Sequence, residues 1–272
     1  MRFFLGILVF LAGFTSAGHS EEHSGLRTML TGDDGRGWEA VGRLNIAGIS
    51  MCTGALIAPD LVLTAAHCMF DKNSHKQVDA TKIEFLAGWR AGRATAYARV
   101  KRAVVHPEYT YALTADDIRV RNDIAVLQLT RPIQKTSITP FVTGPRPRKG
   151  AMVGVVSYAR GRADSPSIEE SCRVLARQSG TLILSCDVDF GASGAPVFDL
   201  SNGNPTIVSV VSAMAEVMGR KVALGMSLAE PLKVVMEKLK ETEGPFQQPK
   251  SAAHRLLFQS NLDHTGAKFV RP

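Results

Sequence analysis

The stretch that decides the fold of this 272-residue chain reads Leu63-Thr64-Ala65-Ala66-His67-Cys68. An apolar strand ends here in small residues and presents a histidine, next to a cysteine that can fix its position. A histidine titrates near neutral pH, so it can take a proton from a hydroxyl group and return it to a leaving group. The stretch therefore suggests a general base at a strand end, although a lone histidine is more often a core residue.

Short apolar or alternating runs, bounded by turn residues, surround this stretch. Such runs without long helical patterns between them predict an all-β fold, either antiparallel barrels or a sandwich. The 24 glycines and 13 prolines, against 7% aromatic residues, agree with many turns. The expected strands are 41–46, 53–58, 61–65, 82–87, 94–105, 124–129, 151–157, 172–177, 181–185, 195–199, 206–215 and 221–227.

One helix, one linker and a tail complete the expected organisation. The pattern from Pro231 to Glu241 predicts a C-terminal helix that packs on the last barrel, and Gly244-Pro245 follows its end. The loop 144–150 contains prolines and basic residues that exclude it from a central strand, so it is expected to join the two halves. We therefore expect a domain over 37–245, with halves at 37–143 and 151–230, and a basic, solvated tail over 246–272.

The N-terminus has the pattern of a secretory signal. A single Arg2 precedes an apolar run over 3–14, and small residues follow at Thr15-Ser16-Ala17. The run is shorter than the roughly 20 apolar residues of a membrane-spanning helix. We therefore expect cleavage near Ala17 and a secreted or periplasmic protein. The polar, glycine-rich segment 18–36 is then interpreted as a flexible leader or propeptide.

Charge and cysteine content limit the classes of partner. The formal net charge is +7, but the chain has no dense Lys/Arg block with interleaved aromatic residues, so the charge indicates a solvated basic surface rather than a nucleic-acid site. Export permits disulfides, and spacing alone leaves three possible pairings open. Without a C-x-x-C pair or clustered histidines, we expect no metal site. The four cysteines are Cys52, Cys68, Cys172 and Cys186.

Two further segments carry candidate chemistry. Asp123 stands immediately before the apolar run 124–129, where it is either a capping residue or a buried group that orients an imidazole. The second segment, 189–197, reads D-F-G-A-S-G-A-P-V and surrounds Ser193 with glycines and alanines. Glycine permits the backbone that turns two N–H groups toward one point, as an oxyanion hole requires, although a plain turn has a similar composition.

Together these segments resemble the trypsin/chymotrypsin-like serine peptidases. The chain order His67, Asp123, Ser193 is that of this family and differs from the order in α/β-hydrolases and in subtilisins. The resemblance extends over about 38–241 and implies two antiparallel six-stranded β-barrels with the active site between them. The matching motifs are T-A-A-H-C at 64–68, N-D-I-A-V-L-x-L at 122–129 and G-x-S-G-x-P-V at 191–197.

The resemblance also implies a role for each of these residues. His67 would be the general base, Asp123 the group that orients it, and Ser193 the nucleophile. The backbone N–H groups of Gly191 and Ser193 would be the oxyanion donors. The chain would then be a secreted serine endopeptidase that needs no cofactor, acts as a monomer on polypeptide substrates and meets protein inhibitors, without nucleic acid or membrane insertion. The alternatives are a non-proteolytic binding or adhesion homologue, and an esterase.

The same resemblance implies how the cysteines pair. Cys52 with Cys68 matches the family's histidine-loop disulfide, which leaves Cys172 to pair with Cys186. Each bond would close a loop of roughly 15 residues and contribute on the order of 3 kcal/mol in the chain-entropy model.

Specificity and activation are expected to depart from trypsin. Asp187 precedes Ser193 by the spacing at which trypsins keep the acid of their primary pocket, which implies a preference for Arg or Lys at P1; the alternative is a structural acid beside Cys186. The Cys186-Asp187 pair is similar to the bacterial branch that includes glutamyl endopeptidases. Ala192 stands where trypsins have an acidic residue, so we expect no salt-bridge activation of the trypsin kind.

Substrate is expected to pair with one strand edge in the second half. By the same resemblance, Ser212, Ala213 and Met214 form the edge along which the substrate backbone lies. Met214 replaces the glycine that is usual in trypsins, and its side chain is expected to narrow the mouth of the primary pocket.

Overall fold

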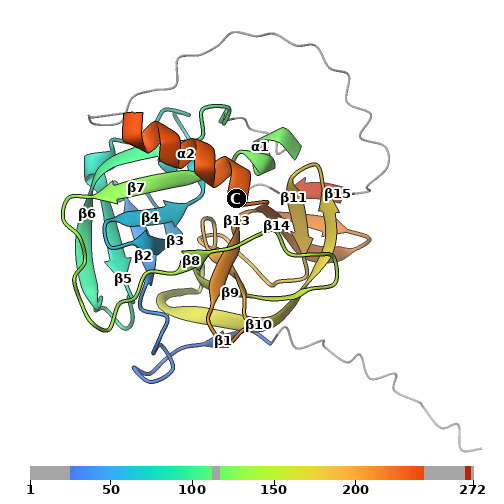
Figure 1. The fold of residues 1–272 in the computed structure, drawn as a ribbon, viewed down its shortest axis with the longest axis horizontal. Coiled ribbons are helices and arrows are strands. Elements are labelled where there is room, and N and C mark those ends of the chain that lie inside the picture. Colours follow the sequence, from blue (N-terminus) through green and yellow to red (C-terminus); the bar gives the residue numbers. More distant parts are fainter. Residues whose placement is uncertain (1–24, 112–116, 242–266, 271–272) are drawn as a thin grey trace, which may run out of the picture.

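Two β-barrels, built from successive halves of the chain, make up the computed structural model, which describes residues 25–111, 117–241 and 267–270 (Figure 1). The all-β fold with two antiparallel six-stranded barrels and a C-terminal helix is therefore confirmed. Among the described residues, no helix has the length and hydrophobicity needed to cross a membrane.

The first barrel is closed in the order β2-β3-β4-β7-β6-β5. Its strands alternate apolar side chains toward the interior, as the buried positions of β2 illustrate. Large side chains that are fully buried, among them Leu44, Phe85 and Leu127, fill the interior. The strands are β2 (Val41–Ile46), β3 (Ser50–Ala58), β4 (Leu61–Thr64), β5 (Ile83–Ala87), β6 (Ala96–Val105) and β7 (Ala125–Leu129).

The second barrel runs in the order β10-β11-β14-β13-β12-β9 and closes through the pairing of β9 with β10. Short strands extend it: β1 (Arg27–Thr28) pairs with β10, while β8 (Val142–Thr143) and β15 (Ala267–Val270) pair with β13. The barrel strands are β9 (Met152–Ala159), β10 (Arg162–Gln178), β11 (Thr181–Leu184), β12 (Pro196–Asp199), β13 (Thr206–Val217) and β14 (Arg220–Met226).

Strand β10 is longer than the sequence pattern predicts, because only 172–177 was expected to be extended. Pro166 and the polar residues around it obscure the first half of this strand. Proline is tolerated there because its carbonyl, rather than an N–H group, makes the edge contact: the N–H of Met29 donates to the Pro166 carbonyl at 2.8 Å. The barrel therefore includes residues that a propensity argument assigns to a loop.

The same contact corrects the expectation of a flexible leader. In the described part of that segment, Arg27 and Thr28 pair with Ile168 and Ser167 of β10, and the side chain of Met29 is fully buried. Residues 18–24, like the expected signal at 1–17, lie outside the described residues. The described end of this segment is an integral edge of the second barrel.

Helix α2 (Ala229–Glu241) begins before the expected start at Pro231, whose missing N–H is harmless in a first helical turn. The helix was expected to pack on the last barrel, and this was wrong: it lies against β6 and β7 of the first (Figure 1). Its apolar stripe, Leu232, Val235 and Leu239, is buried in the core cluster that contains the interior of that barrel. The other helical segments are η1 (Ala66–Met69), η2 (Ala80–Lys82) and α1 (Asp117–Arg121).

Three aromatic rings join the two barrels. Phe198 on β12 packs edge-on against Phe141 at a centroid distance of 4.7 Å and against Trp38 at 5.0 Å. Phe198 is only 1% exposed, and its cluster includes residues from both barrels. Edge-to-face aromatic pairs add to the free energy gained by burial.

Replacing Phe198 with Ala is expected to lower the free energy of unfolding by about 3–5 kcal/mol, because the truncation leaves a cavity at the junction of the barrels. Urea unfolding monitored by circular dichroism measures the change. The control is Leu30→Ala, which removes an apolar side chain that is 69% exposed and should shift stability by less than about 0.5 kcal/mol. Equal effects of both substitutions would contradict a junction role for Phe198.

Candidate active site

The His67 segment is a short 3-10 turn held at both ends. β4 ends at Thr64, Ala65 is extended, and η1 then buries Ala66 to Met69. The disulfide between Cys52 and Cys68 ties the turn to β3. The second expected disulfide, Cys172–Cys186, is also present. Because the turn is anchored by β4 on one side and by a covalent bond on the other, the imidazole has a fixed place.

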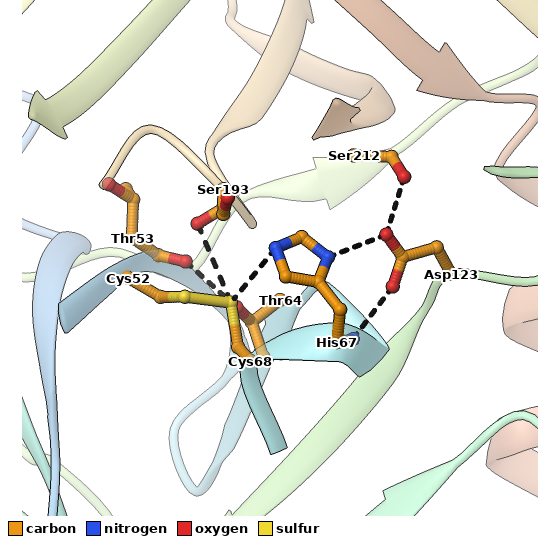
Figure 2. A network of polar contacts seen from close by, with 8 residues as sticks. All are labelled: Cys52, Thr53, Thr64, His67, Cys68, Asp123, Ser193 and Ser212. Atoms are coloured by element: carbon orange, nitrogen blue, oxygen red, sulfur yellow. Dashed lines mark hydrogen bonds and ion pairs between the residues drawn. A yellow bond between two sulfur atoms is a disulfide. The ribbon is translucent and has the colours of Figure 1, made fainter. Parts of the chain in front are cut away.

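Asp123 lies in the short segment between α1 and β7, and its carboxylate is fully buried. Figure 2 shows it beside the His67 ring. Its Oδ1 accepts the backbone N–H of His67 at 2.8 Å, and its Oδ2 lies 2.7 Å from His67 Nδ1. The hydroxyl of Ser212 on β13 also donates to Oδ2. Asp123 therefore contacts the imidazole of His67, as one of the two sequence interpretations expected.

Burial by itself would raise the pKa of Asp123. The charge of His67 and the hydrogen bonds from His67 and Ser212 together outweigh burial, so the pKa lies below its ordinary value. The carboxylate is therefore ionised at neutral pH. An ionised carboxylate only accepts hydrogen bonds, so the proton of the neutral His67 ring sits on Nδ1 and Nε2 is left as an acceptor.

The Ser193 loop is pressed against β3 and β4. The N–H of Thr53 donates to the Ser193 carbonyl at 2.9 Å, and the N–H of Gly194 donates to Val211 on β13 at 2.8 Å. Gly194 has a φ of +80°, and a Cβ there would lie 2.1 Å from Thr64 Oγ1. Only glycine permits both this conformation and this approach.

The N–H groups of Gly191 and Ser193 lie in the same loop. Gly191 has a φ of +100°, and its carbonyl accepts the Thr53 hydroxyl at 2.9 Å. Within the part of the chain that the structure describes, neither the Gly191 N–H nor the Ser193 N–H donates to a protein acceptor. Both N–H groups are thus available to an external oxygen. The residue between them, Ala192, is fully buried and, being alanine, has no carboxylate.

His67 and Ser193 line one cavity of about 450 Å³. Cys68 Sγ lies 3.9 Å from His67 Nε2 and 3.9 Å from the Ser193 carbonyl oxygen, and Figure 2 shows Ser193 on the Nε2 side of the ring. The cavity wall adds apolar residues and a cation, Arg160, whose guanidinium lies 4.2 Å above the Phe190 ring. Ser193, the His67 imidazole and Gly191 therefore line one cavity.

Cys52, Cys68 and His67 place two sulfur atoms and an imidazole close together. Their sulfur atoms form a disulfide, whereas a metal ligand would need a thiolate. This cluster therefore does not form a metal site.

Asp187 is exposed, and its surroundings differ from those of an isolated pocket acid. Its N–H donates to Glu169 Oε2 at 2.7 Å. Burial raises the pKa of Glu169, and the Asp187 charge adds to the rise, against the Asp187 N–H hydrogen bond and the Arg162 charge. Burial lowers the pKa of Arg162, and the charges of Asp187, Asp189 and Glu169 oppose this lowering. Sequence reasoning missed Glu169 and Arg162, since β10 was not expected to extend over their positions.

Ser212 and Met214 both lie on β13, as expected, but they face different surroundings. Ser212 is buried and donates to Asp123. Met214 is half-buried and packs against the apolar cluster that includes Val188, Val211 and Ala223. The strand segment that contains Ser212 and Met214 therefore contacts both the Asp123 carboxylate and an apolar cluster.

Comparison with known proteins gives one family. The family model described as Trypsin matches residues 33–224. Human (Homo sapiens) cathepsin G is 31% identical over 115 residues, which is 42% of this chain and 40% of the relative. Human serine protease 23 is 31% identical over 169 residues, or 54% of this chain and 42% of the relative. The matched part thus spans less than half the length of these curated relatives.

A solved structure has the same fold. It is described as "Structure of Glu endopeptidase in complex with MPD" and superposes with a TM-score of 0.63 at 18% identity, covering 80% of this chain and 97% of that chain.

His106, immediately after β6, is buried; its N–H donates to the Ile124 carbonyl at 3.0 Å, and its Nδ1 accepts the N–H of Glu108 at 3.3 Å. Burial lowers the pKa of His106; the Arg121 charge acts in the same direction and the Glu108 charge opposes them. Because the unfolded state then binds the proton more readily, stability should be complete above the unfolded pKa of about 6.5 and decline as pH falls from there toward the folded pKa.

His106→Gln should therefore reduce the loss of stability between pH 7.5 and pH 5. Urea midpoints at both pH values provide the test. The control is His75→Asn, at an exposed histidine, which should leave the pH dependence unchanged. If His106→Gln keeps the full pH dependence of the parent, burial of a neutral His106 is not its source.

Proposed function

The chain belongs to the trypsin family, and we propose on that premise that it is a serine endopeptidase with His67, Asp123 and Ser193 as its catalytic triad. The observation that carries this proposal is the Asp123 carboxylate, which lies 2.7 Å from His67 Nδ1 and so leaves Nε2 free to accept a proton on the Ser193 side. Spatial order and chain order of the three residues agree with this chemistry.

In the proposed reaction, Ser193 Oγ attacks the peptide carbonyl while His67 Nε2 takes the hydroxyl proton. The proton then passes from Nε2 to the leaving amine as the C–N bond breaks, which leaves an acyl-enzyme ester on Ser193. Water, deprotonated by the same nitrogen, attacks the ester; the bond to Ser193 Oγ then breaks, Oγ regains the proton from Nε2, and the acid is released. Asp123 keeps its charge throughout and stabilises the imidazolium that forms in each half-reaction.

The N–H groups of Gly191 and Ser193 are proposed as the oxyanion donors. Their support is that both lie in the cavity-lining loop and that neither is occupied by an acceptor from the described residues. Donors already in position stabilise the negative oxygen of the tetrahedral intermediate without reorganisation. This mechanism needs no cofactor.

We propose secretion or export to the periplasm as the setting of this reaction. The two disulfides support an oxidising compartment. The expected signal at 1–17 lies outside the described residues, so this part of the proposal depends on the sequence pattern. Proposed partners are polypeptide substrates and protein inhibitors of a monomeric enzyme.

A fluorophosphonate probe should label the protein, because it reacts with an activated serine whatever the substrate. Ser193→Ala should abolish labelling, and Asp123→Asn should slow it by roughly 10³–10⁴-fold, because the imidazole then loses its tautomer and orientation. Ser201→Ala, at an exposed serine, should label like the parent. A folded parent that does not label favours the non-proteolytic binding homologue, and labelling with turnover of simple esters alone favours an esterase.

We further propose that Asp187 gives the enzyme a preference for Arg or Lys at P1. The exposure of Asp187 and the nearby charge of Arg162 weaken this preference. Asp187→Asn should lower kcat/KM for a P1-Arg peptide by about tenfold, or ~1.4 kcal/mol, relative to a P1-Leu peptide. The matched control, Asp189→Asn, removes an exposed carboxylate from the same group and should change the ratio little. An unchanged ratio in Asp187→Asn would identify Asp187 as a structural acid.

A further inference from the structure

The C-terminal strand β15 pairs with the edge of β13 that β14 does not occupy. Residues Ala267–Val270 pair antiparallel with β13, from Val270 opposite Met214 to Ala267 opposite Val217. β14 occupies the other edge of β13 over the same residues. The sequence pattern over 246–272 predicts only a solvated tail, so β15 is a correction to that expectation.

The edge of β13 that β15 covers also contacts the loop that contains Ser193. β12 pairs with β13 as far as Val210, and the N–H of Gly194 donates to the carbonyl of Val211. Ser212 comes next and donates to the Asp123 carboxylate. Within the described parts of the chain, no strand pairs with Ser212 or Ala213 on this edge. The pairing with β15 begins at the next residue of β13, Met214, which lies opposite Val270. One continuous strand edge thus leads from the nucleophile loop to β15.

We propose that β15 is an autoinhibitory strand that competes with extended peptide substrates for the edge of β13. This inference rests on the proposed endopeptidase function, in which the acyl side of the substrate pairs with Ser212–Met214. A substrate that reaches beyond Met214 needs the backbone groups that β15 already engages. A short probe that reacts at Ser193 does not need them.

Main-chain pairing makes such competition chemically reasonable. Strand addition takes its affinity from backbone hydrogen bonds, so an intramolecular segment and an unrelated substrate can use the same groups. The ligand class that competes is therefore any extended polypeptide.

The inhibition should be partial and reversible. A four-residue strand forms few ladder hydrogen bonds, so the bound and released arrangements are expected to exchange. The apparent affinity for a long substrate falls by the fraction of molecules whose edge is free. If β15 covers the edge nine-tenths of the time, the KM for such a substrate rises about tenfold while its kcat is unchanged.

The test uses the full chain with Lys268→Pro and Phe269→Pro together, since proline removes the N–H donors of a ladder. The matched control is Lys268→Ala with Phe269→Ala, which keeps the backbone. Two substrates are compared: a quenched peptide with six residues before the cleaved bond, and the fluorophosphonate probe. The proline variant should lower the KM for the long peptide by about tenfold, while its labelling rate and that of the alanine variant match the parent.

Amide hydrogen exchange supplies a readout that does not depend on activity. Exchange over Met214–Val217 should be faster in the proline variant than in the parent or the alanine variant. If none of the proteins labels but this exchange difference is present, the proposed function fails while the strand contact stands. If all label and the proline variant shows the parent's KM and the parent's exchange, the autoinhibitory strand is refuted.

Discussion

The buried charge of Asp123 is the constraint on which the rest of the structure depends. A carboxylate without water is stable only if its oxygens receive hydrogen bonds. Here the donors come from both barrels: His67 from the turn after β4, and Ser212 from β13. Separating the barrels would remove the Ser212 hydrogen bond from this carboxylate and leave it with the His67 contacts alone. The arrangement of the site and the association of the barrels therefore share one electrostatic requirement.

The backbone of the Ser193 loop lies close against β3 and β4 and so also holds the two barrels together. Thr64 Oγ1 donates to the Thr53 carbonyl at 2.8 Å, and the Thr53 N–H donates to the Ser193 carbonyl at 2.9 Å. Gly194 fits against the same two threonines because it has no side chain. Two first-barrel strands thus position the Ser193 loop of the second barrel, and the aromatic contacts of Phe198 support the same junction.

Most strands and the candidate site were predictable from sequence because local patterns encode them. Apolar runs bounded by turns predicted β2, β4 and β7 nearly at their observed bounds. The chain order of His67, Asp123 and Ser193, and the resemblance of their motifs to one family, predicted that the three belong together. What was missed depends on distant partners. The first half of β10 is extended because β1 and β9 pair with it, and β15 because β13 does. The packing of α2 on the first barrel follows from chain path, which periodicity does not contain.

The two ends of the described fold cross over between the barrels. β1 precedes the first barrel yet pairs with β10 of the second, and α2 follows the second barrel yet packs on β6 and β7 of the first. Each barrel is thus completed by a segment from the opposite end of the chain. Neither half of the sequence contains everything that its own barrel needs. The molecule should unfold in a single cooperative transition, and fragments cut between the barrels should regain structure only when mixed.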